Sequence, residues 1–144
     1  MSPFFSIIIP TYNRAAYLPH AIKSVMDQVF ADWELLIVDD GSTDDTRKVV
    51  QPFLSDERIR YHWQENRELN GARNTGVRLA RGRYIAFLDD DDQYLVNHLS
   101  VLANYLKEKG YPIAAVRTGM YIQVTKKQWT KPPLLQVKHQ HRSE

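Results

Sequence analysis

The chain has 144 residues, of which 43% are hydrophobic and 25% are charged, and its formal net charge is +2. A length and composition of this kind are typical of one soluble globular domain with a sizeable core, and the charge is too small to indicate a nucleic-acid partner. Because cysteine is absent, a disulfide framework and a cysteine-based zinc site are excluded.

The N-terminal third predicts two strands with a helix between them. Residues 4–9 predict a buried strand, which Pro10 is expected to end because proline has no backbone N–H to offer a sheet. A helix is predicted over residues 18–26, where apolar residues recur at i, i+4, i+7 and i+8 and Pro19 fits the first turn. Residues 33–38 predict a second strand, whose unbroken apolar run favours cover on both faces.

The second strand is followed by the polar run 39–45, which predicts a turn and the start of a helix. Ser42 or Thr43 is the expected N-cap, and acidic residues are expected in the first helical turn. The apolar face of this helix is predicted to comprise Val49, Val50, Phe53 and Leu54.

The middle of the chain predicts two more strands. A strand over 59–63 is followed by a polar loop over 64–69 and a helix over 70–81. Residues 83–88 are mostly apolar and predict a fourth, buried strand, which runs directly into the four carboxylates Asp89–Asp92. The inward face of the helix is predicted to comprise Ala72, Leu79 and Ala80.

The C-terminal part begins with a helix predicted over 95–109, with Gly110 at its C′ position. Residues 113–124 predict a strand or a hairpin. We therefore expect a domain over residues 1–124, followed by a basic, proline-containing tail over 125–144 that is loosely ordered or continues into a further segment.

Strands and helices alternate along the chain, which predicts an α/β fold with a mostly parallel sheet and helices on both faces. Parallel strands place their carboxyl ends at one edge of the sheet, where ligands bind in open α/β sheets. Tyr12, the pair Asp39 and Asp40, and the run Asp89–Asp92 are therefore expected to converge on one crevice. This convergence is the strongest indication of function that the residues give by themselves.

The acidic run has two interpretations. Adjacent carboxylates repel one another and raise each other's pKa values, and a divalent cation such as Mg²⁺ or Mn²⁺ relieves that repulsion. The alternative is a solvated acidic turn. Because the chain contains neither G-x-G-x-x-G nor G-x-x-x-x-G-K-[ST], phosphates would need a metal to hold them. A nucleoside diphosphate bridged by the metal fits such a crevice.

Other residues suit the same ligand. Tyr12 could stack on a base, Asp39 or Asp40 could accept hydrogen bonds from the base or the ribose, and Arg73 could neutralise phosphate charge. Each also has a structural interpretation. Tyr12 then covers a loop, the two aspartates serve the turn and the helix N-terminus, and Arg73 is an exposed helix charge.

Four blocks of the sequence together resemble glycosyltransferase family 2. They are Ile7–Arg14, Val38–Asp44, Gly71–Gly76 and Phe87–Asp92, and they occur in the family's order and spacing. The resemblance runs from Phe5 to about Leu106. It implies a Rossmann-like GT-A fold and the metal-dependent, inverting transfer of a sugar from a nucleotide-sugar donor, commonly a UDP-linked one.

The resemblance also implies roles for residues at matching positions. Pro10 and Tyr12 would line the base pocket. Asp40 would read the base with Asp39 beside it, and Arg73 would lie near the base or the diphosphate.

The same resemblance identifies Asp89–Asp91 as the D-x-D motif. Asp91 would ligate Mn²⁺ or Mg²⁺, and Asp89 or Asp90 would face the ribose or the waters of the metal. Because four aspartates stand in a row, the register of this motif is open by one residue.

The chain departs from the family after this motif, where the catalytic base and much of the acceptor pocket usually lie. The last 30 residues contain one acidic residue, Glu144, so no catalytic base is named and little turnover by this chain alone is expected. One alternative is a nucleotide-sugar-binding module without transferase activity. Another is a metal-dependent phosphatase, although Gln93 stands where that motif usually has threonine, and a third is a plain interaction domain.

The expected partners are a nucleotide-sugar donor and a carbohydrate or lipid-linked acceptor of cell-envelope polysaccharide synthesis. No apolar run approaches the ~20 residues that span a bilayer, and residues 1–9 lack the basic start of a signal peptide. We therefore expect a cytoplasmic protein, with peripheral contact to the inner face of the membrane as an option. Apolar surface around residues 113–124 is expected to promote homodimerisation.

Overall fold

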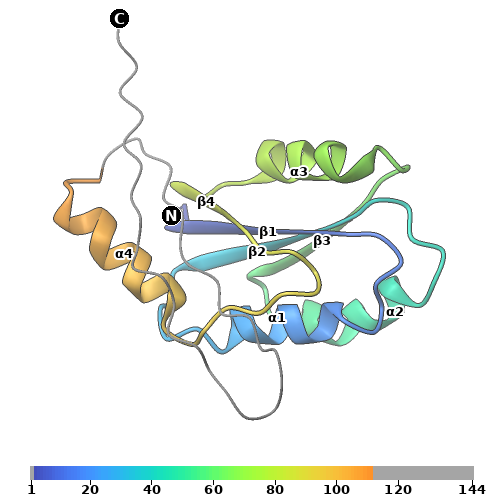
Figure 1. Ribbon diagram of the computed structural model, residues 1–144, viewed down its shortest axis with the longest axis horizontal. Helices are drawn as coiled ribbons and strands as arrows, with labels where there is room; N and C mark the ends of the chain where they lie inside the picture. The colour runs from blue at the N-terminus through green and yellow to red at the C-terminus, as the bar shows by residue number, and fades with distance from the viewer. Residues whose placement is uncertain (1, 112–144) are drawn as a thin grey trace, which may run out of the picture. The chain divides into compact units, whose positions relative to one another are not determined.

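The computed structural model describes residues 2–111, in which strands and helices alternate (Figure 1). The predicted elements within 113–144 and the predicted boundary at residue 124 lie outside the described residues. In order, the elements are β1 (Phe5–Thr11), α1 (Leu18–Met26), β2 (Trp33–Asp39), α2 (Thr46–Val50), the 3₁₀ helix η1 (Gln51–Ser55), β3 (Ile59–Trp63), α3 (Glu68–Leu79), β4 (Tyr84–Phe87) and α4 (His98–Glu108). Among these helices none is both long and apolar enough to cross a membrane.

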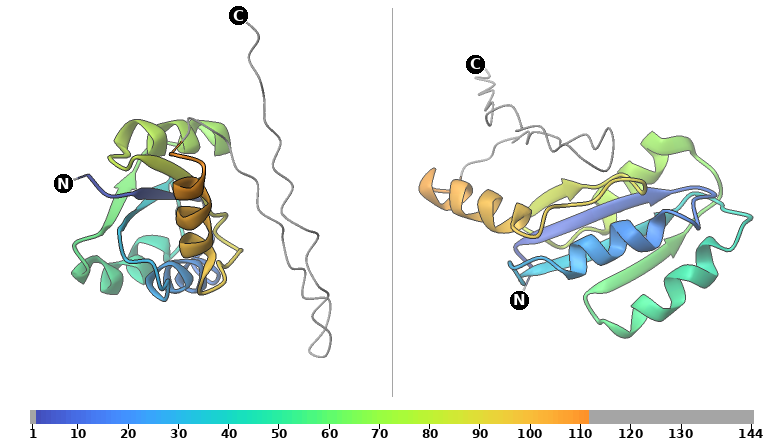
Figure 2. Two further views of the ribbon diagram at one scale, coloured as in Figure 1. Left: turned by 90° about the vertical axis from the view of Figure 1, so that its left-hand side faces the viewer. Right: turned by 60° about the horizontal axis from the view of Figure 1, so that its bottom comes forward.

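The four strands form one parallel sheet in the order β3-β2-β1-β4, which confirms the predicted α/β fold. Helix α3 lies on one face of the sheet, and α1 and α2 lie on the other (Figures 1 and 2). The two central strands are buried along their whole length, as their unbroken apolar sequences predict. Because the four strands are parallel, their carboxyl ends lie together along one side of the sheet.

Strand β1 does not end at Pro10, contrary to the prediction, but pairs with β2 as far as Thr11. The Ile8 carbonyl accepts from Leu88 N–H on the β4 side, whereas the Thr11 carbonyl accepts from Asp40 N–H on the β2 side. Alternation along the strand therefore turns the backbone of Pro10 towards the β4 side, beyond the last residue of that strand. Proline at this position therefore costs the sheet no hydrogen bond, because no residue of β4 lies opposite its nitrogen.

Strand β4 was predicted to be buried, but it is only partly covered, and among the described strands it lies at the edge of the sheet. The side chains of Ile85 and Phe87 are 41% and 45% exposed, while those of Tyr84 and Ala86 are half-buried. An apolar run of only a few residues fits a covered strand and an edge strand equally well, so sequence periodicity could not distinguish them.

Helix α2 begins later than predicted and has no side-chain cap. Asp45 is at its N-cap position, and neither Ser42 nor Thr43 caps the helix. No acidic residue lies in the first turn, so that expectation is wrong as well. The predicted C-terminal glycine of α4 is confirmed, because Gly110 has φ +72° and its N–H donates to the Lys107 carbonyl.

Helix α3 packs on the sheet through a close contact at Gly76. Ala72 on this helix belongs to one buried cluster with Ile8, Leu36 and Val38, and the predicted inward residues Leu79 and Ala80 pack against it. A Cβ atom at Gly76 would overlap the Cγ2 atom of Ile8 and would lie 3.1 Å from its Cδ1 atom. The glycine therefore sets how closely α3 approaches β1.

We expect Gly76→Ala to lower the free energy of unfolding by about 1–3 kcal/mol, because overpacking forces the helix away from the sheet. Helix propensity alone would favour alanine by about 1 kcal/mol, so the two effects have opposite signs. Urea unfolding measures the difference. The exposed Asn74→Ala is the control and should leave the stability unchanged or slightly higher. A Gly76→Ala protein as stable as the wild type would contradict this account of the packing.

A buried carboxylate holds the amino ends of the strands together. Glu34 on β2 is 6% exposed and accepts from Ser6 Oγ at 2.6 Å, from Arg81 N–H at 2.6 Å and from Arg60 Nη1 at 3.0 Å. The Gly82 N–H donates to Ser6 Oγ as well, at 2.7 Å. Burial by itself would raise the pKa of Glu34, but the hydrogen bonds from Ser6, Arg81 and Arg60 and the charge of Arg60 outweigh it and hold the pKa below the usual value of a glutamate.

Glu34→Gln should destabilise the fold by about 2–3 kcal/mol at neutral pH, because it leaves the guanidinium of Arg60, the N–H of Arg81 and the hydroxyl of Ser6 with a weaker, neutral acceptor. Since the pKa of Glu34 is lower in the folded than in the unfolded state, its stabilisation is complete above the unfolded value and is lost as the pH falls through the folded one. Urea unfolding at several pH values should therefore show the gap between the two proteins closing as the pH falls below the ordinary glutamate value of about 4.3. A gap that stays constant as the pH falls would contradict this role.

Candidate functional site

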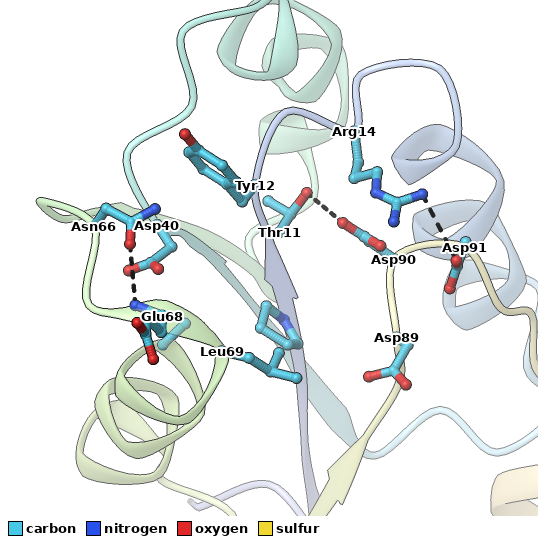
Figure 3. Close-up of a pocket in the computed structure, with 12 residues that line it drawn as sticks. Thr11, Tyr12, Arg14, Asp40, Asn66, Glu68, Leu69, Asp89, Asp90 and Asp91 are labelled. Atoms are coloured by element: carbon cyan, nitrogen blue, oxygen red, sulfur yellow. Dashed lines mark hydrogen bonds and ion pairs between the residues drawn. The ribbon is translucent and has the colours of Figure 1, made fainter.

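The carboxyl ends of β1, β2 and β4 and the start of α3 enclose a cavity of about 460 Å³, a size typical of ligand sites (Figure 3). The predicted convergence of polar clusters at this edge of the sheet is therefore found. The cavity is lined by Pro10, Thr11, Tyr12, Arg14, Asp40, Asn66, Glu68, Leu69, Ala72, Asp89, Asp90 and Asp91.

Asp40 is held firmly on one side of the cavity. It is 3% exposed, and its Oδ1 atom accepts from Gln64 Nε2 at 2.6 Å and from Arg67 N–H at 2.9 Å. Both hydrogen bonds end on the same oxygen, and among the described residues no donor is bonded to Oδ2, which can therefore serve a ligand. The ring of Tyr12 stands beside this carboxylate in the close-up and is 49% exposed (Figure 3).

Asp39 does not line the cavity, although it is adjacent to Asp40 in the sequence. It is 1% exposed and accepts from Ser42 N–H at 2.8 Å and from Tyr61 Oη at 2.5 Å. Burial and this hydrogen bond raise the pKa of Tyr61. Asp39 thus fastens the turn after β2 to the neighbouring strand β3.

Each of the three carboxylates that line the other side of the cavity has a partner of its own. Asp89 pairs with Arg73 Nη2 at 2.8 Å. Asp90 accepts from Thr11 Oγ1 at 2.8 Å, and Asp91 lies 3.8 Å from Arg14 Nη1 (Figure 3). Arg73 itself is not among the lining residues, although it reaches the acidic run. The counter-charges are therefore distributed along the run, and the carboxylates point in different directions.

The pKa values of Asp90 and Asp92 are raised, as predicted for crowded carboxylates, but with a different leading cause. Burial raises the pKa of Asp90, partly offset by the hydrogen bond from Thr11 and the charge of Arg14, and Asp91 and Asp89 raise it further. Burial also raises the pKa of Asp92, followed by the charges of Asp91 and Asp89. Repulsion between neighbours is thus the smaller contribution.

The donor chemistry of the run fits a hard divalent cation, since carboxylate oxygens are what Mg²⁺ and Mn²⁺ prefer. Within residues 2–111, however, no three acidic or histidine side chains are gathered closely enough to hold a metal by themselves. A magnesium-type ion in nucleotide sites usually takes one or two carboxylates and completes its shell with phosphate oxygens and water. The residues present fit that arrangement and do not fit an all-protein cage.

Several lining residues were not singled out by the sequence. Thr11 is the last residue of β1 and Arg14 lies in the loop after it. Asn66, Glu68 and Leu69 lie in a stretch predicted to be a polar loop. Helix α3 begins two residues before its predicted start, so that its first turn forms a wall of the cavity. The polarity of residues 64–69 was the one available signal, and it does not distinguish a loop from a ligand-facing helix end.

Comparison with known proteins identifies the family. The profile described as Glycosyl transferase family 2 matches residues 6–143, almost the whole chain. The chain belongs to glycosyltransferase family 2.

Relatives of this family 2 chain include enzymes that are named for their reactions. It is 44% identical over 112 residues to the GalNAc(5)-diNAcBac-PP-undecaprenol beta-1,3-glucosyltransferase of Campylobacter jejuni, with 76% of this chain and 36% of the relative covered. It is 46% identical over 97 residues to the UDP-Glc:alpha-D-GlcNAc-diphosphoundecaprenol beta-1,3-glucosyltransferase WfgD of Escherichia coli, covering 67% and 38%. The chain thus spans less than half the length of these relatives.

The solved structure of S. aureus TarS residues 1–349 in complex with UDP has the same fold. The TM-score is 0.67 at 30% sequence identity, over 75% of this chain and 32% of that one. This likeness confirms the predicted Rossmann-like GT-A fold for the family 2 chain.

The first residue of α3 has an unusual backbone. Glu68 has φ +62°, a left-handed conformation that costs a residue with a Cβ atom about 1–2 kcal/mol. The N–H of Glu68 donates to Asn66 Oδ1 at 3.1 Å. The side chain of Glu68 lines the cavity and has no hydrogen-bond or ion-pair partner among the described residues. The fold therefore keeps an acidic side chain at a position where glycine would be less strained.

Glu68→Gly should raise the free energy of unfolding by about 1 kcal/mol relative to Glu68→Gln, because both lose the negative charge at the helix N-terminus and only glycine relieves the left-handed strain. Thermal unfolding of the two variants and the wild type measures this. Equal melting temperatures for the two variants would contradict the idea of strain at residue 68.

Proposed function

We propose that this family 2 chain is the donor-binding part of an inverting glycosyltransferase and takes a sugar linked to a nucleoside diphosphate, with UDP as the carrier. The observation that carries the proposal is the single cavity that has Asp40 on one side and the carboxylates Asp89, Asp90 and Asp91 on the other (Figure 3). A base needs a hydrogen-bond acceptor, which Asp40 offers on one side. A diphosphate needs a divalent cation, and the carboxylates on the other side offer ligands for it.

The nucleoside half is proposed to bind beside β1 and β2. Tyr12 stacks on the base and Pro10 forms the wall below it. Asp40 accepts the N–H of the base through Oδ2, the oxygen to which no donor within residues 2–111 is hydrogen-bonded. Uracil presents one N–H between two carbonyls, which suits one free carboxylate oxygen. Asp39 supports the site through the turn that it fastens.

The diphosphate half is proposed to bind along the acidic run with Mn²⁺ or Mg²⁺. Asp91 is the proposed ligand, and Asp89 and Asp90 face the ribose or the waters of the ion. When bound, the metal stabilises the negative charge of the departing nucleoside diphosphate. Arg73 carries part of the same charge, since its guanidinium already pairs with a carboxylate at 2.8 Å.

Transfer itself is proposed to proceed by attack of an acceptor hydroxyl on the anomeric carbon, from the side opposite to the leaving group. The carbon–oxygen bond to the diphosphate breaks as the new glycosidic bond forms, and the hydroxyl proton passes to a base. None of residues 2–111 is assigned as that base. The named relatives act on undecaprenol-linked sugars, and we extend this to a lipid-linked acceptor met at the inner face of the membrane.

A binding role without turnover is the second candidate. What favours it is that every cavity residue with a proposed role contacts the donor. An assay with a radiolabelled UDP-sugar and lipid-linked acceptors distinguishes the two, because a binding module releases no UDP.

Asp91→Asn should weaken Mn²⁺-dependent UDP binding at least ~10-fold, because a neutral amide replaces the proposed metal ligand. Isothermal calorimetry with Mn²⁺ and with EDTA measures this, and the neighbouring Asp92→Asn, which lies outside the cavity lining, is the matched control and should bind within about threefold of the wild type. The ion pair of Asp91 with Arg14 is half-exposed, so the melting temperature should hardly change. UDP binding that is equally tight with EDTA would refute the metal role.

A further inference from the structure

The loops after β1 and β2 are fastened together by one side chain, that of Asn13. Its Oδ1 atom accepts from Thr43 N–H at 2.8 Å, from Asp44 N–H at 3.3 Å and from Thr43 Oγ1 at 3.4 Å. In return, Asn13 N–H donates to Ser42 Oγ at 2.9 Å. We call this set of contacts, with those of Asp44 described next, the Asn13 clasp.

In the other half of the clasp, the acceptor belongs to the loop after β2 and the donor to the loop after β1. Asp44 accepts from Ala15 N–H at 3.1 Å through Oδ2, and from Thr46 N–H at 3.0 Å through Oδ1. Ser42 N–H in turn donates to the buried Asp39 at 2.8 Å. The exposed loop after β1 is therefore anchored, through Asn13 and Asp44, to the start of α2 and to the end of β2.

Asn13 lies between two residues that line the cavity, yet does not line it itself. Its φ is +52°, which turns the chain so that Tyr12 and Arg14 both reach the cavity (Figure 3). Asparagine adopts this left-handed conformation more readily than most residues. The Tyr12 ring has no hydrogen bond, ion pair or ring contact within residues 2–111, so its direction depends on the backbone that the clasp holds.

We propose that Asn13 is a positioning residue for the nucleotide, acting through Tyr12. This inference rests on the proposed function, in which Tyr12 stacks on the base. A loop that samples other conformations lowers the apparent affinity in proportion to the fraction of time in which the binding conformation is populated. Loss of the clasp should therefore weaken nucleotide binding without any direct contact between Asn13 and the ligand.

The central test is a double-mutant cycle on UDP affinity in the presence of Mn²⁺, measured by calorimetry. Asn13→Gly keeps the left-handed backbone and removes the side-chain acceptor, and it should raise Kd about 5- to 20-fold. In a Tyr12→Ala background the same substitution should change Kd less than about twofold, because the group that it positions is gone. A loss of equal size in both backgrounds, or no loss in either, would overturn the proposal.

Two further variants separate the acceptor from the backbone. Asn13→Asp keeps an oxygen at the Oδ1 position and should recover at least half of the free energy of binding that Asn13→Gly loses. Asn13→Ala loses the acceptor and also strains the left-handed backbone, so it alone of the three should lower the melting temperature clearly. If Asn13→Gly bound UDP as the wild type does while Asn13→Ala did not, only backbone strain would matter and the clasp would be irrelevant.

A ligand-free measurement separates failure of this inference from failure of the proposed function. Amide hydrogen exchange by NMR should show faster exchange at Ala15 in Asn13→Gly, although the acceptor of Ala15 is Asp44 and not Asn13. Unchanged protection of Ala15 would overturn the clasp whether or not UDP binds. If Ala15 exchanges faster but the wild type binds no UDP, the proposed donor is wrong and the clasp still holds the two loops.

Discussion

The site depends on one backbone hydrogen bond, from Asp40 N–H to the Thr11 carbonyl at 2.9 Å. It joins the ends of the two central strands at the level of the cavity. Thr11 then reaches the segment after β4 through its hydroxyl, which donates to Asp90 at 2.8 Å. Asp40 reaches the segment after β3 through the hydrogen bonds from Gln64 and Arg67. Every wall of the cavity is thus tied to this pair, so a shift of either strand would move the whole site.

The sequence sufficed for the sheet and for the convergence of polar clusters, because both follow from local rules. Unbroken apolar runs identify β1 and β2, and parallel strands bring their carboxyl ends together. The exposure of β4 and the reach of β1 beyond Pro10 depend on which strands are neighbours. Neighbours are a property of the folded chain, which the composition of a single run does not contain.

Which of Asp39 and Asp40 faces the cavity could not be predicted from the sequence either. Adjacent residues of a strand point to opposite sides. One of the pair must therefore face the cavity and the other must face away, but the sequence does not determine which. The structure places Asp40 at the cavity and gives both oxygens of Asp39 to internal donors. A glutamate in the left-handed region, as at residue 68, is invisible for a related reason, since helix propensity says nothing about the sign of φ at a helix start.

The amino ends and the carboxyl ends of the strands differ in how their charged groups are paired and in backbone strain. At the amino ends, Glu34 is buried with its oxygens hydrogen-bonded by side-chain and backbone donors, which favours stability. At the carboxyl ends lie two of the three non-glycine residues within 2–111 that have a positive φ, Asn13 and Glu68; the third is Tyr111. The ion pairs of Asp89 and Asp91 there are made with partly exposed arginines. Strain and exchangeable ion pairs cost free energy, and folds retain them chiefly where a ligand can use them. The uneven distribution of strain and charge therefore points to the same edge of the sheet as the cavity does.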